Sequence, residues 1–220
     1  MIRKDLEYNG EPLSGEIMRH TRELKKVRNF IRTRKKKTTF EQRFLELYEP
    51  FMEQAEEVAQ RVQESRATAL YRQSIRERRI CHGDYSQHNL IFDREGAVAV
   101  NFARCCFDTQ IADFYQFFRK IMEKQSWNRK LGMEMLHTYQ QVRPLGDAEF
   151  EDFCIRLAYP EKFLETCKPL FQQPQDLDTG KKPSEAGNIG YAGKKTERIC
   201  KVSALKVPFL TFLLYNIAIC

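Results

Sequence analysis

A short polar stretch between two apolar segments contains residue types that could support acid–base chemistry and metal binding. His82, Gly83, Asp84 and Asn89 form the pattern H-G-D-x-x-x-x-N. In phosphoryl transfer, an Asp in such a loop can accept the proton of the attacking hydroxyl, and an Asn five residues later can ligate Mg²⁺. A second metal ligand must then come from a following strand, at whose expected end Asn101 lies. The simpler alternative is a loop whose polar groups only cap the local backbone.

The segment after the loop must position the second ligand. Two short apolar runs, NLIF and AVAVNF, flank the residues DREG, a glycine-containing turn of hairpin length. The sequence therefore predicts a β-hairpin, with Asn101 at the end of its second strand. His88 could be considered as an acid in the same loop, but a solvated loop histidine is the simpler interpretation.

Helices are predicted on both sides of this hairpin. Apolar residues recur with helical spacing from Gly15 to about Ser65, with a break near residues 37–39, and again over residues 67–78. Thr38 or Thr39, followed by Glu41, is a suitable start for the second helix. After the hairpin, helical patterns occur in DFYQFFRKIMEK, LGMEMLHTYQQV and DAEFEDFCIRLAYPEKF, the last stopped by Pro160. The expected fold class is mainly α with a small β-hairpin (α+β).

Composition limits the class of protein. The chain has 220 residues, 42% of them hydrophobic and 30% charged, which favours a globular protein. Its seven cysteines include no C-x-x-C pair, so we expect reduced thiols and neither a zinc site nor a disulfide framework. The one long apolar run, Val207–Cys220, is too short to span a membrane and contains Pro208. We expect no membrane contact and no signal peptide.

Positive charge is concentrated in one predicted helix, residues 19–37. This segment holds ten Lys and Arg residues and one acid, Glu23, whereas the whole chain has a net charge of +7. A solvated helix face is the simpler interpretation. The alternative is an anionic docking face formed by Lys25, Lys26, Arg28 and Arg32. Apart from Phe30 the segment lacks aromatic residues for base stacking, so we do not expect specific nucleic-acid binding.

Several motifs resemble those of one protein family. The loop CHGDYSQHN resembles the catalytic loop of the aminoglycoside phosphotransferase and choline kinase-like superfamily, within the protein-kinase-like fold. Together with MRHTRELKKVRNFIR, FDTQIADFYQFFRKIMEK and IRLAYPEKF, in this order, it resembles the CotS-like spore-coat family of that fold. The resemblance covers roughly residues 10–163. It implies that residues 1–163 form the C-terminal helical lobe of the fold, with residues 80–102 as the catalytic-loop region.

The resemblance also assigns roles to individual residues. Asp84 matches the catalytic base of the superfamily, and His82 matches the residue that helps to hold the loop. Asn89 matches the first Mg²⁺ ligand. Gly83 and Asp113 correspond to structural support of the loop, Asp113 as the acid that braces the loop backbone from the following helix.

Two departures from the superfamily pattern lower the expected activity. Asn101 occupies the position of a Mg²⁺-binding Asp, and its neutral carbonyl oxygen is a poorer Mg²⁺ ligand, so we expect weak or lost Mg²⁺ binding. The residues before His82 are predicted to be helical and lack a glycine-rich strand-turn-strand. We therefore expect the N-terminal lobe to be absent and ATP to bind poorly.

The composition changes after Phe163. Residues 164–220 contain Pro, Gly and Gln clusters without an apolar period until the terminal run. If one extra T follows a TTT codon for Phe163, the other reading frame can encode WKLANHYFNSPKTWIPG, which resembles the continuation of the family. The hypothesis is that residues 164–220 are an out-of-frame, irregular or disordered tail.

Three functional hypotheses follow from the sequence. The first is a truncated spore-coat kinase-like protein that is catalytically silent. The second is an active ATP-dependent small-molecule phosphotransferase, if the chain is paired with a missing N-terminal lobe. The third is a structural coat component that binds spore-coat proteins or anionic polymers through its basic helix. We expect a cytoplasmic or spore-coat location, and the sequence favours no oligomeric state.

Overall fold

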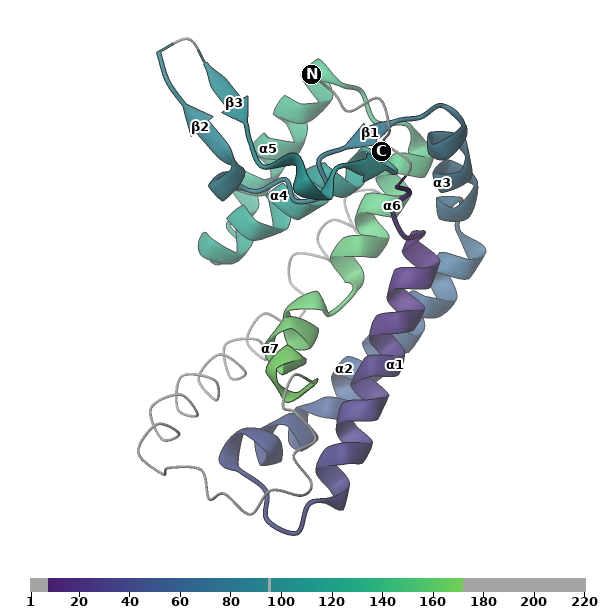
Figure 1. Ribbon diagram of the computed structural model, residues 1–220, viewed down its shortest axis with the longest axis vertical. Coiled ribbons are helices and arrows are strands. Elements are labelled where there is room, and N and C mark those ends of the chain that lie inside the picture. The colour runs from purple at the N-terminus through teal and green to yellow at the C-terminus, as the bar shows by residue number, and fades with distance from the viewer. Residues whose placement is uncertain (1–7, 95, 172–220) are drawn as a thin grey trace. The chain divides into compact units, whose positions relative to one another are not determined.

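The computed structural model describes residues 8–94 and 96–171 (Figure 1). These residues divide into two compact units. Residues 8–16, 60–94 and 96–158 form the first, here called the loop unit because it contains the H-G-D-x-x-x-x-N loop. Residues 17–59 and 159–171 form the second, the helical unit.

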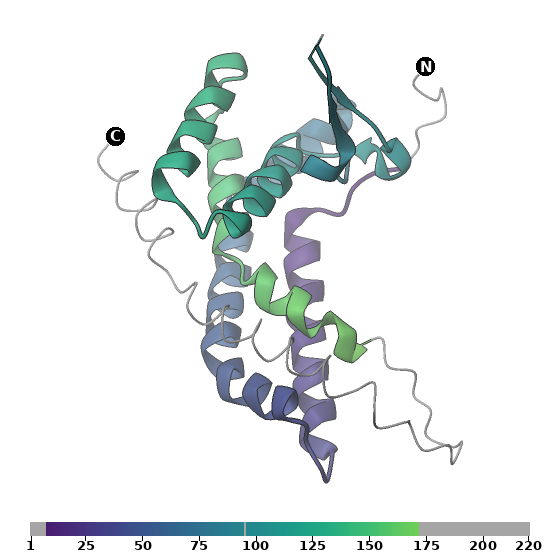
Figure 2. The same cartoon turned by 90° about the vertical axis from the view of Figure 1, so that its left-hand side faces the viewer.

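The helical unit is built from parts of three helices: α1 (Leu13–Thr33), α2 (Thr39–Glu64) and α7 (Glu161–Phe171). Its core contains the apolar stripe that predicted the first two helices. Phe44 and Phe51 of α2 stack on Phe163 of α7, with ring centroids 5.4 and 4.4 Å apart. These contacts fix α7 against α2 (Figure 2).

The predicted break between the first two helices is confirmed, and a capping box defines it. The Thr38 hydroxyl accepts the Glu41 backbone N–H, with 3.2 Å between the two atoms. The Glu41 carboxylate in turn accepts the Thr38 backbone N–H at 2.7 Å. Because this exchange satisfies two otherwise unpaired donors, α2 begins at Thr39, as the local sequence predicts.

The loop unit contains the remaining helices, α3 (Ala67–Arg76), α4 (Ile111–Lys124), α5 (Arg129–Val142) and α6 (Asp147–Ala158). Helix α6 ends just before Pro160, as predicted. An apolar cluster joins α4, α5 and α6, with Phe118 and Phe153 at its centre. Among the phenylalanines of α4, Phe114 and Phe118 are buried in this cluster, whereas Phe117 is only partly buried.

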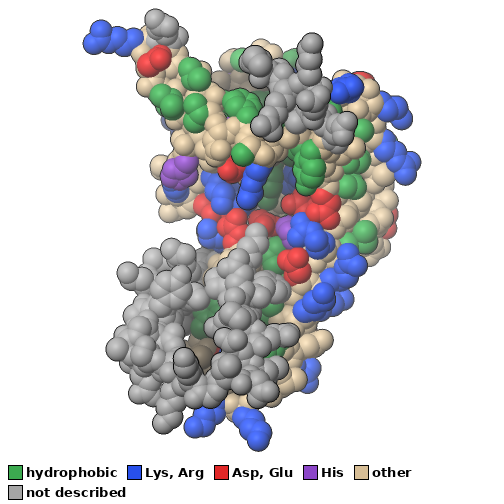
Figure 3. Space-filling model, in the orientation of Figure 1, with side chains coloured by type: hydrophobic (Ala, Val, Ile, Leu, Met, Phe, Trp, Pro, Cys, Tyr) green, Lys and Arg blue, Asp and Glu red, His purple; other side chains and the backbone are tan. Residues whose placement is uncertain are grey.

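The loop unit also contains two small antiparallel sheets. Strand β2 (Leu90–Phe92) pairs with β3 (Ala97–Ala99), which confirms the predicted hairpin. Strand β1 (Ile80–Cys81) pairs with β4 (Cys106–Phe107), a pairing that the sequence did not predict. Apolar side chains of the hairpin are exposed (Figure 3), including Phe92 at 72%. The fold class is confirmed as mainly helical with small antiparallel sheets.

The structure also bears on the expected tail. Helix α7 continues past Phe163 to Phe171, and Leu164 and Cys167 are fully buried, so residues 164–171 are helical rather than irregular. The rest of the expected tail, residues 172–220, lies outside the described residues. In the part of the chain that is described, no helix combines the length and the apolar character needed to cross a bilayer.

Candidate functional site

The loop begins directly after β1 and is braced from α4. The Asp113 carboxylate, in the first turn of α4, accepts hydrogen bonds from the backbone N–H groups of His82 and Gly83, at 2.5 and 3.0 Å. Burial raises the pKa of Asp113, and these two donors partly oppose that increase. The structure thus places Asp113 where the family resemblance implied, beneath the backbone of the loop.

The His82 side chain links the loop to the end of β3. Its Nε2 atom lies 2.8 Å from the Val100 carbonyl oxygen, which can only accept, so Nε2 carries a proton. Its Nδ1 atom accepts the Asp84 backbone N–H at 3.2 Å. The imidazole is therefore neutral in this arrangement. His82 is 5% exposed and its ring packs on Phe102, with ring centroids 4.6 Å apart, so His82 positions the loop.

Gly83 is required by the backbone path. Its φ of +74° lies in the left-handed region, which residues with a Cβ rarely adopt. A Cβ added at this position would lie 2.1 Å from the Arg104 carbonyl oxygen, far inside van der Waals contact. Only glycine allows the loop to turn this close to Arg104.

Asp84 and Asn89 occupy opposite ends of the loop. The Asn89 side-chain N–H donates to the Asp84 backbone carbonyl at 2.7 Å and so closes the loop. Asn89 is 8% exposed, whereas Asp84 is partly exposed. The Asp84 carboxylate makes no hydrogen bond or ion pair within the described residues. It is therefore available to accept a proton from a bound hydroxyl, the role that the loop pattern predicts.

Asn101 lies beside Asn89, as the hairpin prediction required. It adopts a left-handed conformation, with φ 66° and ψ 54°, which Asn tolerates better than most residues. Its side-chain N–H donates to the Asn89 side-chain oxygen, with 3.3 Å between Nδ2 and Oδ1. Across the described residues, no group of three or more His, Cys, Asp and Glu side chains could hold a metal ion.

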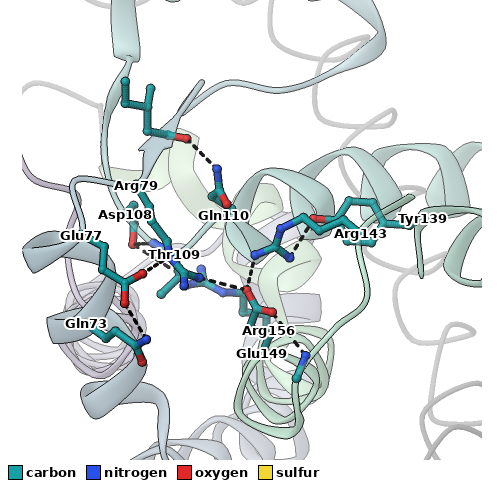
Figure 4. A network of polar contacts seen from close by, with 12 residues as sticks. Gln73, Glu77, Arg79, Asp108, Thr109, Gln110, Tyr139, Arg143, Glu149 and Arg156 are labelled. Carbon is teal, nitrogen blue, oxygen red and sulfur yellow. Dashed lines mark hydrogen bonds and ion pairs between the residues drawn. The ribbon is translucent and has the colours of Figure 1, made fainter. Parts of the chain in front are cut away.

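A polar network fixes the segment that leads into β1 (Figure 4). Arg79 donates to Glu77 at 2.6 Å and forms an ion pair with Glu149 at 3.7 Å. Glu149 also binds Arg143, at the end of α5. On the other side, the Asp108 backbone N–H donates to the Arg79 carbonyl oxygen at 3.1 Å. The residue directly before β1 and the residue directly after β4 are thereby joined to each other, and the first of them is also joined to α6.

A charge cluster around the buried Arg156 of α6 lies next to the start of α4. Arg156 pairs with Asp152 at 2.5 Å and with Glu16 at 3.5 Å. It also donates to the Thr109 hydroxyl at 3.4 Å (Figure 4). Burial raises the pKa of the nearby Asp108 to about 6, although Arg156 lowers it in part.

Sequence reasoning missed the parts of the site that act through backbone atoms or distant partners. The ring of Phe102 and the carbonyl group of Val100 hold His82, yet neither residue type suggests such a role. The only available signal was the position of Phe102 in the sequence. It directly follows Asn101, at the end of the predicted hairpin. The i, i+4 spacing of Asp152 and Arg156 could have indicated their ion pair.

Acidic side chains of α2 partly neutralise the basic face of α1. The number of Lys and Arg residues on α1 therefore overstates the positive electrostatic field of that face. Lys25 pairs with Glu56 at 2.7 Å. Arg28 pairs with Glu49 at 2.5 Å. The other two predicted docking residues are exposed and make no ion pair with a described acid: Lys26 and Arg32.

Comparisons with known proteins identify the family of the chain and a similar fold. A family model described as "Spore coat putative kinase YutH" matches residues 18–200. The chain belongs to this family. A crystal structure of an aminoglycoside phosphotransferase from Alicyclobacillus acidocaldarius matches with a TM-score of 0.79 at 14% sequence identity, which establishes similarity of fold alone. A search among curated proteins found no match.

The two matches differ in their extent. The structural match covers 96% of this chain but only 60% of the phosphotransferase chain, so a large part of that protein has no counterpart here. The family match runs past Phe163 to residue 200 and so includes residues that the sequence analysis assigned to an out-of-frame tail. Sequencing the gene around the Phe163 codon tests the frame hypothesis, which requires that a single-base deletion there open a helix-forming frame.

Proposed function

We propose that this spore-coat kinase-like chain carries the catalytic-loop half of a phosphotransferase site and does not transfer phosphate by itself. The observation that supports this proposal is the hydrogen bond from Asn101 to Asn89. Asp84 is available as a base, but the neighbouring metal position holds two neutral amides. The proton-accepting half of the site is thus present, and the half that would neutralise phosphate charge is weakened.

The side chains at the metal position do not fit Mg²⁺ as they are arranged. Mg²⁺ requires near-octahedral oxygen ligands and is usually bound through one or two carboxylates. Here the Asn101 amide directs an N–H group at the one side-chain oxygen of Asn89. A cation at that oxygen would have to displace the amide hydrogen and would gain no carboxylate from Asn101. We infer that Mg²⁺ binding is weak or lost.

The described residues also lack an element that would cover a nucleotide. Residues 8–81 form α1, α2, α3 and the two-residue strand β1, with no glycine-rich strand-turn-strand among them. We infer that the chain corresponds to the C-terminal lobe of the kinase-like fold and that ATP binds poorly. If a nucleotide-binding lobe were supplied from outside this chain, the same Asp84 could serve a small-molecule phosphotransferase, which is the alternative hypothesis.

A turnover assay tests the silent state. ATP consumption should be measured with Mg²⁺ and with Mn²⁺, in the presence of small hydroxyl and amino compounds, for the wild type and for Asp84→Ala. We expect equal background rates, since the base has no positioned phosphate to act on. A wild-type rate well above that of Asp84→Ala would overturn the proposal.

A second candidate function is docking in the spore coat, where family membership suggests that the protein is located. The supporting observation is the exposure of Lys26 and Arg32, which have no acidic partner within the described residues. Basic side chains in this state attract coat proteins or polymers that carry negative charge. The partner is proposed only by this chemistry, and the salt dependence of binding tests it.

A further inference from the structure

The pairing of β1 with β4 places two cysteines face to face. Cys81 lies directly opposite Cys106 in the antiparallel register. Directly opposite residues in such a pair have Cα atoms roughly 4.5–5.5 Å apart and project their side chains to the same face. Disulfides form across Cα separations of roughly 4.4–6.8 Å. The short sheet therefore holds two thiols within bridging range.

Burial shows that both side chains point into the protein. Cys81 is 2% exposed and Cys106 is 6% exposed, whereas the neighbouring Ile80 is 37% exposed. Cys105 precedes β4 and is only partly buried. Cys105 lies outside the strand register, so Cys106 is the cysteine opposite Cys81.

We propose that Cys81 and Cys106 form a reversible disulfide when the protein meets a small-molecule disulfide such as glutathione disulfide. One cysteine thiolate attacks the oxidant and releases one glutathione thiolate, which leaves a mixed disulfide on the protein. The second cysteine thiolate attacks the protein sulfur of that mixed disulfide and releases the second glutathione. The protein loses two electrons and two protons, and one glutathione disulfide becomes two glutathione thiols.

The chemistry of the two thiols predicts a slow reaction. Burial, followed by the negative charges of Asp108 and Asp113, raises the pKa of Cys106 to about 11. Burial and the same two carboxylates raise the pKa of Cys81 as well. The thiolate is the attacking form, so the closed sheet reacts slowly. Each strand has only two residues, and local opening of this sheet exposes the thiols to the oxidant.

The bond would close a loop around most of the candidate site. Residues 82–105 lie between the two cysteines and include the H-G-D-x-x-x-x-N loop, the hairpin and Asn101. A cross-link there restricts the unfolded chain and prevents separation of the two strands that anchor the loop. The oxidised protein should therefore unfold at a higher temperature than the reduced protein. This expectation does not depend on phosphoryl transfer.

Peptide mapping tests the pairing directly. The full chain is incubated with glutathione disulfide or with dithiothreitol, alkylated, and digested with trypsin without reduction. Cleavage after Arg79, Arg94, Arg104 and Arg119 yields one peptide with Cys81 and one with both Cys105 and Cys106. We expect these peptides to be joined in the oxidised wild type and in Cys105→Ser, but not in Cys106→Ser.

Thermal unfolding provides the second measurement. Oxidation should raise the unfolding temperature of the wild type and of Cys105→Ser by about 5–10 °C, and dithiothreitol should reverse the increase. If Cys106→Ser does not fold, the wild type and Cys105→Ser still decide the outcome. The proposal is overturned if the oxidised wild type shows no joined peptides, or if the link is lost in Cys105→Ser.

Discussion

The Asn101 side-chain amide donates a hydrogen bond to the Asn89 side-chain oxygen, with 3.3 Å between the two atoms. This bond joins the end of the loop to the end of the hairpin. An amide hydrogen thereby occupies the position on Asn89 that a cation would need. The pair links the loop to the hairpin without an ion, and the proposal of a weakened metal site rests on this bond.

Asn101→Asp should convert this pair into a metal-dependent one. A carboxylate has no N–H to donate, so its oxygens would face the Asn89 oxygen and destabilise the loop without a cation. We expect the variant to unfold at a lower temperature than the wild type and to recover several degrees with millimolar Mg²⁺ or Mn²⁺. The wild type should show little response to either ion.

A matched control separates metal binding from the added charge. Asn128 caps α5 by accepting the Leu131 backbone N–H, a role that Asp fulfils equally well. Asn128→Asp should therefore unfold as the wild type does, with no response to metal. If Asn101→Asp also shows no metal-dependent gain, the stretch keeps the family's shape but has no ion site.

Gly83→Ala should destabilise the loop unit strongly. The substitution places a Cβ against the Arg104 carbonyl oxygen and forces alanine to adopt a φ of +74°. A left-handed conformation and the clash together should cost more than about 2 kcal/mol of unfolding free energy. Gly146→Ala is the control because its Cβ would meet no atom within 4 Å. Equal urea midpoints for the two variants would contradict the tight approach.

Asp113→Asn should loosen the loop backbone. The carboxylate accepts two backbone N–H groups, whereas an amide has only one acceptor oxygen and leaves one of those donors unsatisfied. The expected loss is about 1–3 kcal/mol of unfolding free energy. Hydrogen–deuterium exchange should become faster at His82 and Gly83, while the amides of α5 serve as an internal control. Unchanged exchange at both loop amides would remove the bracing role.

Local signals account for what the sequence predicted correctly. Helical periodicity identified α1 and α2, and the capping residues Thr38 and Glu41 lie within one turn of each other. The hairpin was predictable because its two strands are separated by a short turn with Gly96. In each of these cases the interacting residues are close in sequence, so the pattern itself contains the information.

Non-local contacts explain what the sequence could not show. Strands β1 and β4 have two residues each, too few for a period, and their pairing joins distant segments. Contacts between distant segments also decide the charge of α1. Counting its Lys and Arg residues in the sequence assumes that none of them is paired with an acid. Only the structure shows that Glu56 and Glu49 neutralise Lys25 and Arg28.

Charge reversal tests the docking hypothesis at the two exposed cations. Lys26→Glu with Arg32→Glu should weaken binding to an anionic polymer such as polyglutamate at low salt, because these side chains have no acidic partner within the described residues. Lys25→Glu with Arg28→Glu changes the same net charge but removes two ion pairs, so it should also lower stability. Binding that is indifferent to salt and to the first pair of substitutions would exclude the docking role.

Asp108→Asn should change how stability depends on pH. The pKa of Asp108 is raised from 3.8 to about 6 in the folded protein, mainly because the side chain is buried. Between these values the folded state binds the proton more tightly than the unfolded state, so unfolding free energy falls as pH rises. A shift of about two units corresponds to about 3 kcal/mol, which is fully present below about pH 4 and is lost as the pH rises to about 6.

The amide introduced by Asp108→Asn cannot ionise, yet its carbonyl oxygen can still accept the Thr109 backbone N–H that the Asp108 carboxylate binds at 2.7 Å. The variant should therefore lack this part of the decline and gain stability relative to the wild type as the pH rises from about 4 to about 7. Urea unfolding at several pH values across this range measures the difference. Asp147→Asn, at a side chain that is 91% exposed, should follow the wild type. A stability difference between Asp108→Asn and the wild type that stays constant over this range would show that Asp108 is already ionised at the acidic end, despite its burial.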